Sequence, residues 1–212
     1  VALYPAADEV EPVYAALSDL ARDTRTTLVV GYYDVGLDEN HAVVIGPDGA
    51  VYGDYVKTHL IPGFEDYNAG DGRRVTVDSP AARLGVLICQ DDNFPDLARG
   101  YSRDRVSLLT VPTNDWAQVQ EFHLQGVALR CVDSGFAVVR GATHGVSAII
   151  DARGRVLARR DHHTEGAGPL VADLSLVRAG TGYAYAGAWL PILCFVFLVT
   201  AAAVGRRDGS SD

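Results

Sequence analysis

Short apolar runs rich in Val, Ile and Leu are the feature that most constrains the fold of this chain. Several of these runs are apolar at every position, which is typical of strands buried on both faces. The runs lie at 27–33, 42–46, 84–88, 106–111, 136–140 and 146–150. Glycine-containing turns at 46–50 and 151–156 each join two such segments and predict hairpins.

Two further segments, 9–23 and 117–133, have the spacing of amphipathic helices. The positions that we expect to form their apolar faces are Val10, Val13, Leu17 and Leu20 in the first, and Val119, Phe122, Gly126, Leu129 and Val132 in the second. Strand pairs mixed with helices predict an α/β fold with a mixed sheet.

Length and composition exclude several classes of protein. The 212 residues suit one sizeable domain with its own core. The net charge of −9 argues against a nucleic-acid partner, because a phosphate backbone needs a basic surface. The three cysteines are odd in number and widely spaced, which predicts neither a disulfide framework nor a zinc site. Methionine is absent and the chain opens inside the apolar run "VALYP", so we expect it to lack its natural N-terminus.

The C-terminal composition predicts a membrane anchor. Residues 186–205 carry no charge, and about 20 apolar residues suffice to cross a bilayer as a helix. Aromatic residues precede this stretch and Arg206 and Arg207 follow it, as interfacial aromatics and the positive-inside rule require. We therefore expect a globular domain over 1–178, a linker over 179–185, a transmembrane helix over 186–205 and a cytoplasmic tail over 206–212. The globular domain would lie outside the cytoplasm.

Cys89 ends the apolar run 84–88 and is followed at once by polar residues, in "RLGVLICQDDNFPDLAR". A free cysteine in such a place is either a small core residue or a thiol presented to a substrate. The polar segment favours the second interpretation, as do "VKTHLIPGFE" (56–65) and "VPTNDW" (111–116), which bring ionisable groups to other strand ends. Lys57 is the only lysine against 17 arginines, so it is either a chance survivor or a residue whose compact ammonium arginine cannot replace.

Four segments together resemble the nitrilase, or carbon–nitrogen hydrolase, superfamily. They are "GDYVKTHLIPGFE", "LGVLICQDDNFPDLAR", "LLTVPTNDW" and "HLQGVALRCVDSGFAVVRGATHGVSAIIDARGRVLA", and their order and spacing are similar to those of the family. The branch they resemble most is that of the apolipoprotein N-acyltransferases, which hold a nitrilase-like domain outside the cytoplasm by membrane helices. The resemblance covers roughly residues 1 to 205 and implies an α-β-β-α sandwich with mixed sheets, followed by one C-terminal transmembrane helix.

The resemblance also implies roles for individual residues. Cys89 matches the nucleophile of the family's Glu–Lys–Cys triad, Lys57 the lysine that stabilises the oxyanion, and Glu65 a further glutamate of the acyltransferase branch. The physics agrees, because an ammonium near a thiol lowers the thiol pKa and binds developing negative charge. Asn114 and Trp116 are the candidate substrate-binding residues, although Trp116 can equally pack under a loop.

The triad glutamate itself has no match. The family places it after the first strand in a "PE" step, where this chain has Pro5 followed by Ala6. A methyl group cannot take a proton from the thiol. Asp8 and Glu9 come next, and we interpret them as a helix N-terminus, with Asp8 as the cap. Either the chain is a degenerate member, or another carboxylate such as Glu65 or Asp91 acts as the base.

The remaining candidates have structural interpretations. We expect His123 to make a structural hydrogen bond, and Cys131 to be an inert core residue on its helix. His162 and His163 lack a third ligand nearby in the sequence, so we interpret them as exposed turn residues rather than metal ligands. No metal and no cofactor are predicted.

Three functions remain open. The first is a membrane-anchored N-acyltransferase that takes an acyl chain from phospholipid onto Cys89 and passes it to the N-terminal amine of a lipid-modified apolipoprotein, at the extracytoplasmic face of a bacterial inner membrane. The second is a carbon–nitrogen hydrolase that cleaves a small amide. The third is a non-catalytic domain that binds lipid or protein, which the substitution at Ala6 favours.

Overall fold

The computed structural model describes residues 3, 5, 9–79, 81–177, 180–187 and 189–208. Its helices and strands, in chain order, are α1 Val10–Thr24, β1 Leu28–Asp34, β2 Glu39–Ile45, β3 Val51–Val56, β4 Thr76–Asp78, β5 Arg83–Val86, the 3₁₀ helix η1 Cys89–Asn93, α2 Pro95–Arg103, β6 Leu108–Thr113, α3 Gln120–Ser134, β7 Ala137–Ala142, β8 Val146–Ile150, β9 Val156–Asp161, α4 His162–Glu165, α5 Gly182–Ala186 and α6 Trp189–Asp208.

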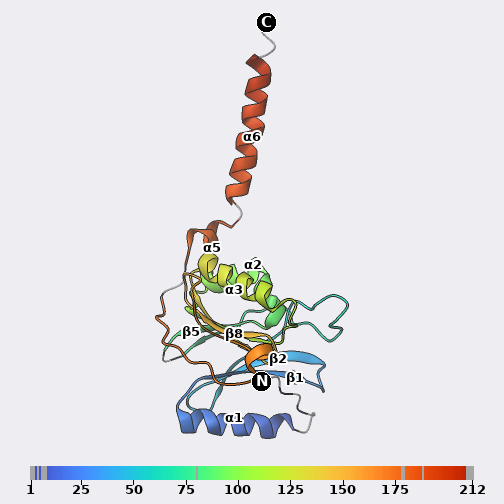
Figure 1. Ribbon diagram of the computed structural model, residues 1–212, viewed down its shortest axis with the longest axis vertical. Helices are drawn as coiled ribbons and strands as arrows, with labels where there is room; N and C mark the ends of the chain where they lie inside the picture. Colours follow the sequence, from blue (N-terminus) through green and yellow to red (C-terminus); the bar gives the residue numbers. More distant parts are fainter. Residues whose placement is uncertain are drawn as a thin grey trace.

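These elements form four layers, with α1 outside one sheet and α2 and α3 outside the other (Figure 1). The first sheet has the order β1-β2-β3 and is antiparallel. The second has the order β4-β5-β6-β7-β8-β9, and it is parallel from β5 to β7 and antiparallel elsewhere. The predicted α/β fold with a mixed sheet is therefore confirmed, and the layers are those of an α-β-β-α sandwich.

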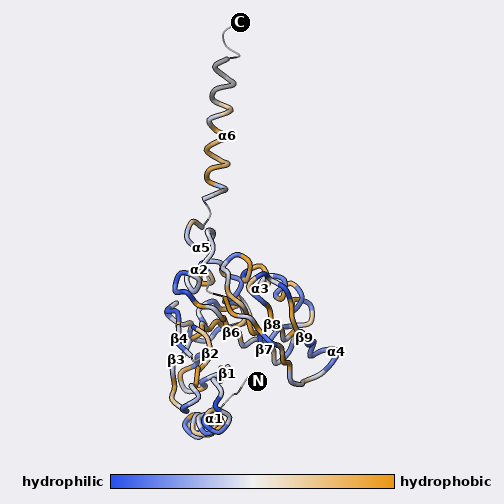
Figure 2. The backbone as a smooth tube through the Cα atoms, turned by 90° about the vertical axis from the view of Figure 1, so that its left-hand side faces the viewer, coloured by the Kyte–Doolittle hydropathy of each residue, from blue (hydrophilic) through white to orange (hydrophobic). Residues whose placement is uncertain are grey.

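Apolar strand residues form the core. The larger cluster lies between the sheets and under α2 and α3, and it includes Val44, Val86, Leu109 and Val138, all without exposed surface. A smaller cluster around Ala21 joins α1 to the first sheet. Figure 2 shows the same division, with hydrophobic residues along the inner strands and a largely hydrophilic α1.

The predicted apolar face of the second helix is wrong. On α3, Phe122 is 70% exposed, and Leu129 and Val132 are exposed too. The buried face instead carries a different apolar set, Leu124, Val127 and Cys131, together with the polar residues Gln120 and His123. Gln120 Nε2 donates to Asp161 Oδ2 and His123 Nδ1 pairs with Asp115 Oδ1, so these contacts offset part of the cost of burying two polar side chains. On α1 the prediction is wrong for Leu20, which is 49% exposed.

The predicted transmembrane helix is not supported. The apolar C-terminal stretch does form a helix, α6, which extends away from the layered domain (Figure 1). Within the described residues, no helix combines the length and apolarity required to cross a membrane.

The segment between domain and α6 packs against the domain. Helix α5 occupies much of the predicted linker, and the carbonyl oxygen of Ala184 accepts a hydrogen bond of 2.8 Å from Arg103 Nε. Ala184 is fully buried and Thr181 Oγ1 donates to the carbonyl oxygen of Asp133. These contacts fix the start of the C-terminal segment on α2 and α3.

Candidate active site

Cys89 lies where the chain turns out of β5 into η1. Its φ of 47° places it in the left-handed region, which costs a non-glycine residue of order 1–3 kcal/mol. The preceding residue, Ile88, is still extended, with φ −121° and ψ 118°. Such strain persists only where the surrounding structure imposes it, and it is concentrated at functional sites. The turn brings the sulfur to the end of the sheet, at 7% exposure.

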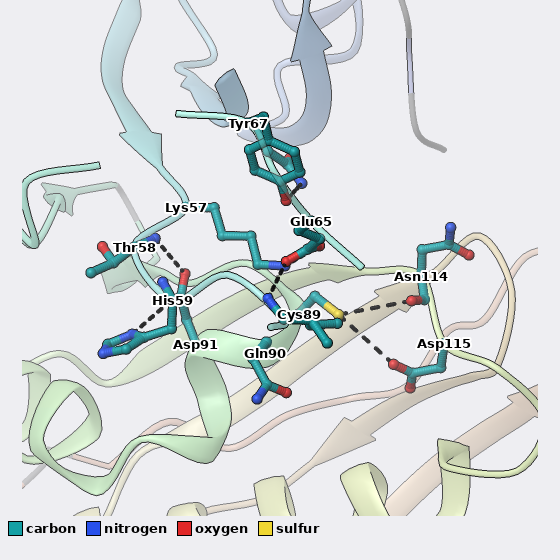
Figure 3. A network of polar contacts seen from close by, with 12 residues as sticks. Lys57, Thr58, His59, Glu65, Tyr67, Cys89, Gln90, Asp91, Asn114 and Asp115 are labelled. Atoms are coloured by element: carbon teal, nitrogen blue, oxygen red, sulfur yellow. Dashed lines mark hydrogen bonds and ion pairs between the residues drawn. The ribbon is translucent and has the colours of Figure 1, made fainter. Parts of the chain in front are cut away.

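Lys57 and Glu65 form a buried ion pair beside Cys89 (Figure 3). Lys57 directly follows β3, and its Nζ lies 2.6 Å from Glu65 Oε1 and 2.7 Å from Glu65 Oε2. Glu65 Oε2 also accepts a hydrogen bond of 2.7 Å from the backbone N–H of Ile61, which closes the loop between the two residues. Lys57 is 1% exposed, so its charge is held by this carboxylate rather than by water.

The thiol of Cys89 is in contact with two acceptors. Its Sγ lies 3.8 Å from the carbonyl oxygen of Asn114 and 3.9 Å from Asp115 Oδ1, as Figure 3 shows. Burial raises the pKa of the Cys89 thiol above its usual value, and the charge of Asp115 raises it further. The charge of Lys57 acts in the opposite direction. The resting sulfur is therefore a thiol near neutral pH, poised between an anionic and a cationic neighbour.

A cavity of about 600 Å³ gives access to this sulfur. Cys89, Lys57 and Glu65 line it, and so do Asn114 and Trp116, so the cavity brings together every site residue predicted from the sequence. Of the two interpretations of Cys89, a thiol presented to a substrate fits the structure, because Cys89 lines an open cavity rather than lying in the closed core. Whether these residues carry the predicted roles stays a prediction.

The cavity has an aromatic wall. Trp116 is 47% exposed, and its ring lies 5.0 Å from that of Phe64, centroid to centroid. Phe64 comes from the loop that also carries Glu65, and both aromatic residues line the cavity. Of the two interpretations of Trp116, a place in the wall of a pocket therefore fits the structure.

Asp91 is a structural residue rather than a base. Its carboxylate is fully buried and accepts hydrogen bonds from Tyr55 Oη at 2.8 Å and from the backbone N–H of His59 at 2.7 Å. The backbone N–H of Thr58 donates to it as well, at 3.3 Å. These bonds tie η1 to the loop after Lys57, and Asp91 does not line the cavity. The suggestion that it replaces the missing glutamate therefore does not hold.

A buried ionic network beneath the thiol escaped the sequence analysis. Asp115 Oδ1 lies 2.9 Å from His123 Nδ1, and Asp115 Oδ2 lies 2.8 Å from an Arg140 guanidinium nitrogen. Burial works against the ionised form, but the His123 hydrogen bond and the Arg140 charge together lower the pKa of Asp115. His123 thus makes the structural hydrogen bond that was predicted. The feature of the sequence that could have identified Arg140 is its place as the one charged residue of the apolar run 136–140.

Asp92 is the unsatisfied member of this network. Arg140 Nε lies 3.6 Å from Asp92 Oδ2, and neither carboxylate oxygen accepts a hydrogen bond within the described structure. Burial raises the pKa of Asp92 to about 6. Two carboxylates, Asp92 and Asp115, therefore share one buried guanidinium directly below the nucleophile.

A third histidine, His144, lies close to His162 and His163 in space. The ring of His144 lies 4.8 Å from that of His162 and 6.2 Å from that of His163, centroid to centroid. Within the described residues, no group of His, Cys, Asp or Glu side chains is arranged to hold a metal ion. Instead, His144 Nδ1 pairs with Asn114 Oδ1 at 2.9 Å, which links the histidines to the active site.

The position of the missing glutamate, Ala6, lies outside the described residues, as does Asp8. Around it, Pro5 is buried and Leu3 forms a parallel bridge with Tyr32. Helix α1 begins at Val10, so this stretch is a helix N-terminus as predicted, but the N-cap residue is Glu9 and not Asp8.

Similarity to known proteins extends over most of the chain. The carbon–nitrogen hydrolase family model matches residues 2–182. The apolipoprotein N-acyltransferase of Geobacter metallireducens is 29% identical over 92% of this chain and 42% of its own length, and that of Rickettsia bellii is 31% identical over 51% of this chain and 26% of its own length. The chain thus spans less than half the length of these curated relatives.

Solved structures share the fold. The carbon–nitrogen hydrolase from Helicobacter pylori G27 has a TM-score of 0.66 at 22% identity, covering 73% of this chain and 64% of that one. An amidase from Nesterenkonia sp. has a TM-score of 0.69 at 20% identity, covering 82% and 68%. The match over residues 2–182 holds both sheets and the cavity with Cys89, Lys57 and Glu65, and on this ground the chain belongs to the carbon–nitrogen hydrolase family.

Proposed function

We propose that this chain is the catalytic domain of an N-acyltransferase, which transfers an acyl chain from phospholipid to the N-terminal amine of a lipid-modified apolipoprotein. The observation that carries the proposal is the shared cavity, in which the Cys89 thiol meets the buried Lys57–Glu65 pair. Relatives named apolipoprotein N-acyltransferase support the choice of this branch.

The reaction proceeds in two steps through a thioester. The sulfur of Cys89, on losing its proton, attacks an ester carbonyl of the phospholipid. The C–O bond breaks, and the released alcohol, a lysophospholipid, takes up the proton. The free amine of the acceptor then attacks the thioester carbonyl, which forms an amide and returns the thiol. In each step the Lys57 ammonium stabilises the negative charge that develops on the carbonyl oxygen.

The aromatic wall supports an acyl substrate. Phe64 and Trp116 present apolar surface at the cavity, and burying each methylene of a chain on such surface contributes about 0.8 kcal/mol. Both substrates of the proposed reaction reside in a bilayer. We therefore place the domain at the extracytoplasmic face of a bacterial inner membrane, with the exposed apolar residues of α6 towards lipid.

A small-amide hydrolase is the second candidate. It uses the same nucleophile and oxyanion stabilisation, and water takes the place of the acceptor amine. The amidase from Nesterenkonia sp. among the structural neighbours favours it. A third candidate, a binding domain without turnover, is favoured by Ala6 and by the raised pKa of the Cys89 thiol.

Acylation of Cys89 tests the proposal directly. The protein is incubated with phospholipid in detergent, and the peptide that contains Cys89 is examined by mass spectrometry. An acyl adduct that a lipopeptide amine removes faster than water supports the acyltransferase, and Cys89→Ser is the control. Faster release by water favours the hydrolase. An adduct that forms only in Ala6→Glu identifies a degenerate site, and no adduct in either protein refutes the proposal.

A further inference from the structure

A second, smaller cavity adjoins the catalytic cavity. Its volume of about 360 Å³ lies in the range of about 300–1,000 Å³ that is usual for ligand sites. Its polar wall is formed by Thr143, Ser147, Arg160 and His162. Gly141 and Thr143 line both cavities, so a ligand in one lies next to a ligand in the other.

The charge of this cavity is opposite to that of the protein. None of the residues that line it is acidic, although the chain carries a net charge of −9. Arg160 donates from Nε to the carbonyl oxygen of Gly166 and from Nη2 to that of Glu165, both at 2.9 Å. Its Nη1 has no partner among the described residues. The backbone bonds thus fix a half-buried guanidinium and leave one edge of it for an anion.

The nearest carboxylates are occupied. Asp161 Oδ1 accepts the backbone N–H of His163, and Asp161 Oδ2 accepts Gln120 Nε2. Glu165 Oε1 accepts the backbone N–H of Asp161. No carboxylate is therefore paired with the Arg160 guanidinium within the described structure.

Side-chain contacts connect this cavity to the nucleophile. The His162 ring, in the wall of the small cavity, lies edge to face against His144 at 4.8 Å. His144 pairs with the side-chain oxygen of Asn114, and the backbone carbonyl oxygen of the same Asn114 is in contact with the Cys89 sulfur. A ligand that extends from the small cavity across the shared wall of Gly141 and Thr143 enters the cavity that holds the Cys89 sulfur.

We propose that the small cavity binds the phosphodiester group of the phospholipid acyl donor, and that this holds the ester carbonyl at Cys89. The inference rests on the proposed function and names the part of the substrate that the protein recognises. A guanidinium is suited to phosphate oxygens, and the Thr143 hydroxyl lies in the wall shared with the catalytic cavity. Free phosphate has the same chemistry, but the shared wall favours a ligand that occupies both cavities at once.

Shielding of Cys89 from alkylation tests this without requiring turnover. The protein is treated with iodoacetamide in the presence of dihexanoyl phosphatidylglycerol or of dihexanoylglycerol, which has the same chains but no phosphate. Peptide mass spectrometry gives the alkylation rate at Cys89. We expect the phospholipid to shield Cys89 at concentrations about tenfold lower than the neutral lipid, since a charge-assisted hydrogen bond contributes about that factor.

Two variants and one control separate the cavity from general effects. Arg160→Gln should raise the half-shielding concentration of the phospholipid about tenfold and leave that of dihexanoylglycerol unchanged. His162→Gln, which leaves the Arg160 loop bonds in place, should shift it in the same direction. Arg159→Gln removes the same charge from the neighbouring residue, which pairs with Glu121 at the surface, and should change neither value.

The outcomes separate this inference from the proposed function. If Arg160→Gln and His162→Gln raise the half-shielding concentration of the phospholipid but not that of dihexanoylglycerol, the result supports the headgroup site. An equal change for both lipids, or no change for either, overturns it. Inorganic phosphate that binds the Arg160 site as tightly as the phospholipid assigns the site to free phosphate and overturns the headgroup. If neither lipid shields Cys89 in the unaltered protein, the proposed function fails and this inference fails with it.

Discussion

Replacing Asp92 by Asn should stabilise the protein at alkaline pH and leave it nearly unchanged in acid. The Asp92 carboxylate is 1% exposed, accepts no hydrogen bond from the described residues, and has Arg140 Nε 3.6 Å from its Oδ2. Burial raises its pKa from 3.8 to about 6, so the cost of desolvation exceeds the attraction of the guanidinium.

The magnitude follows from the two pKa values. Because the folded-state pKa is raised, the folded chain holds this proton more tightly than the unfolded chain. The stability that the group contributes is therefore present below about pH 3.8 and lost as the pH rises through about 6. The full difference corresponds to about 3 kcal/mol. An asparagine cannot ionise, so the Asp92→Asn variant avoids this loss.

Urea unfolding followed by circular dichroism at pH 4 and pH 8 measures the effect. The stability of Asp92→Asn relative to the unaltered protein should increase by about 2–3 kcal/mol between the two pH values. Asp173→Asn, at an exposed position, is the matched control and should show no such change. A difference that is the same at both pH values, or a variant that is less stable at pH 8, would show that the Arg140 pair outweighs burial and would refute the reasoning.

Three further predictions concern the cavity. Lys57→Arg keeps the charge but not the compact shape, and at 1% exposure the larger fork has no room, so Cys89 acylation should fall about 100-fold while circular dichroism stays native; an unchanged rate would contradict this. Glu65→Gln leaves the Lys57 ammonium buried without its carboxylate and should lower the free energy of unfolding by about 3–5 kcal/mol in urea titrations, whereas a loss below 1 kcal/mol would mean that water replaces the pair. Trp116→Ala should raise KM for long-chain acyl donors about tenfold and leave short-chain donors unaffected, and an equal effect on both would remove Trp116 from the acyl site.

The prediction of the site from the sequence was more accurate than the prediction of the helix faces, because the two depend on different physics. Cys89 and Asn114 each lie just beyond an apolar run, and strand ends of a layered sheet meet at one edge. Lys57 and Glu65 were assigned by the family resemblance, and the structure places them in the same cavity. The apolar spacing of α3 pointed to the wrong face, because a second apolar set, Leu124, Val127 and Cys131, is the one that is buried. Gln120 lies on the same face and donates to a distant partner, Asp161. Such partners lie far away in the sequence and leave no periodic signal.

Other misses have similar causes. Strands β3 and β9 are partly exposed and contain Asp or Arg, so no apolar run marks them. Arg140 sits at a position that an apolar strand normally gives to the surface, yet the structure buries it between Asp92 and Asp115. The C-terminal helix was predicted from composition alone, and the structure begins it at Trp189 rather than at residue 186.

The proposed reaction requires that the Cys89 thiol lose its proton, and the structure shows which groups are placed to accept it. Glu65 is bound to Lys57, Asp91 is occupied by the loop before it, and the pKa of Asp115 is lowered by His123 and Arg140, which makes it a weak base. None of these three carboxylates is therefore free to take the proton, and the family's position for one holds Ala6. The rate of Cys89 alkylation should therefore continue to rise at pH values above those at which a free thiol is fully ionised. A rate that reaches its plateau near neutral pH would instead reveal a base among the residues around Cys89.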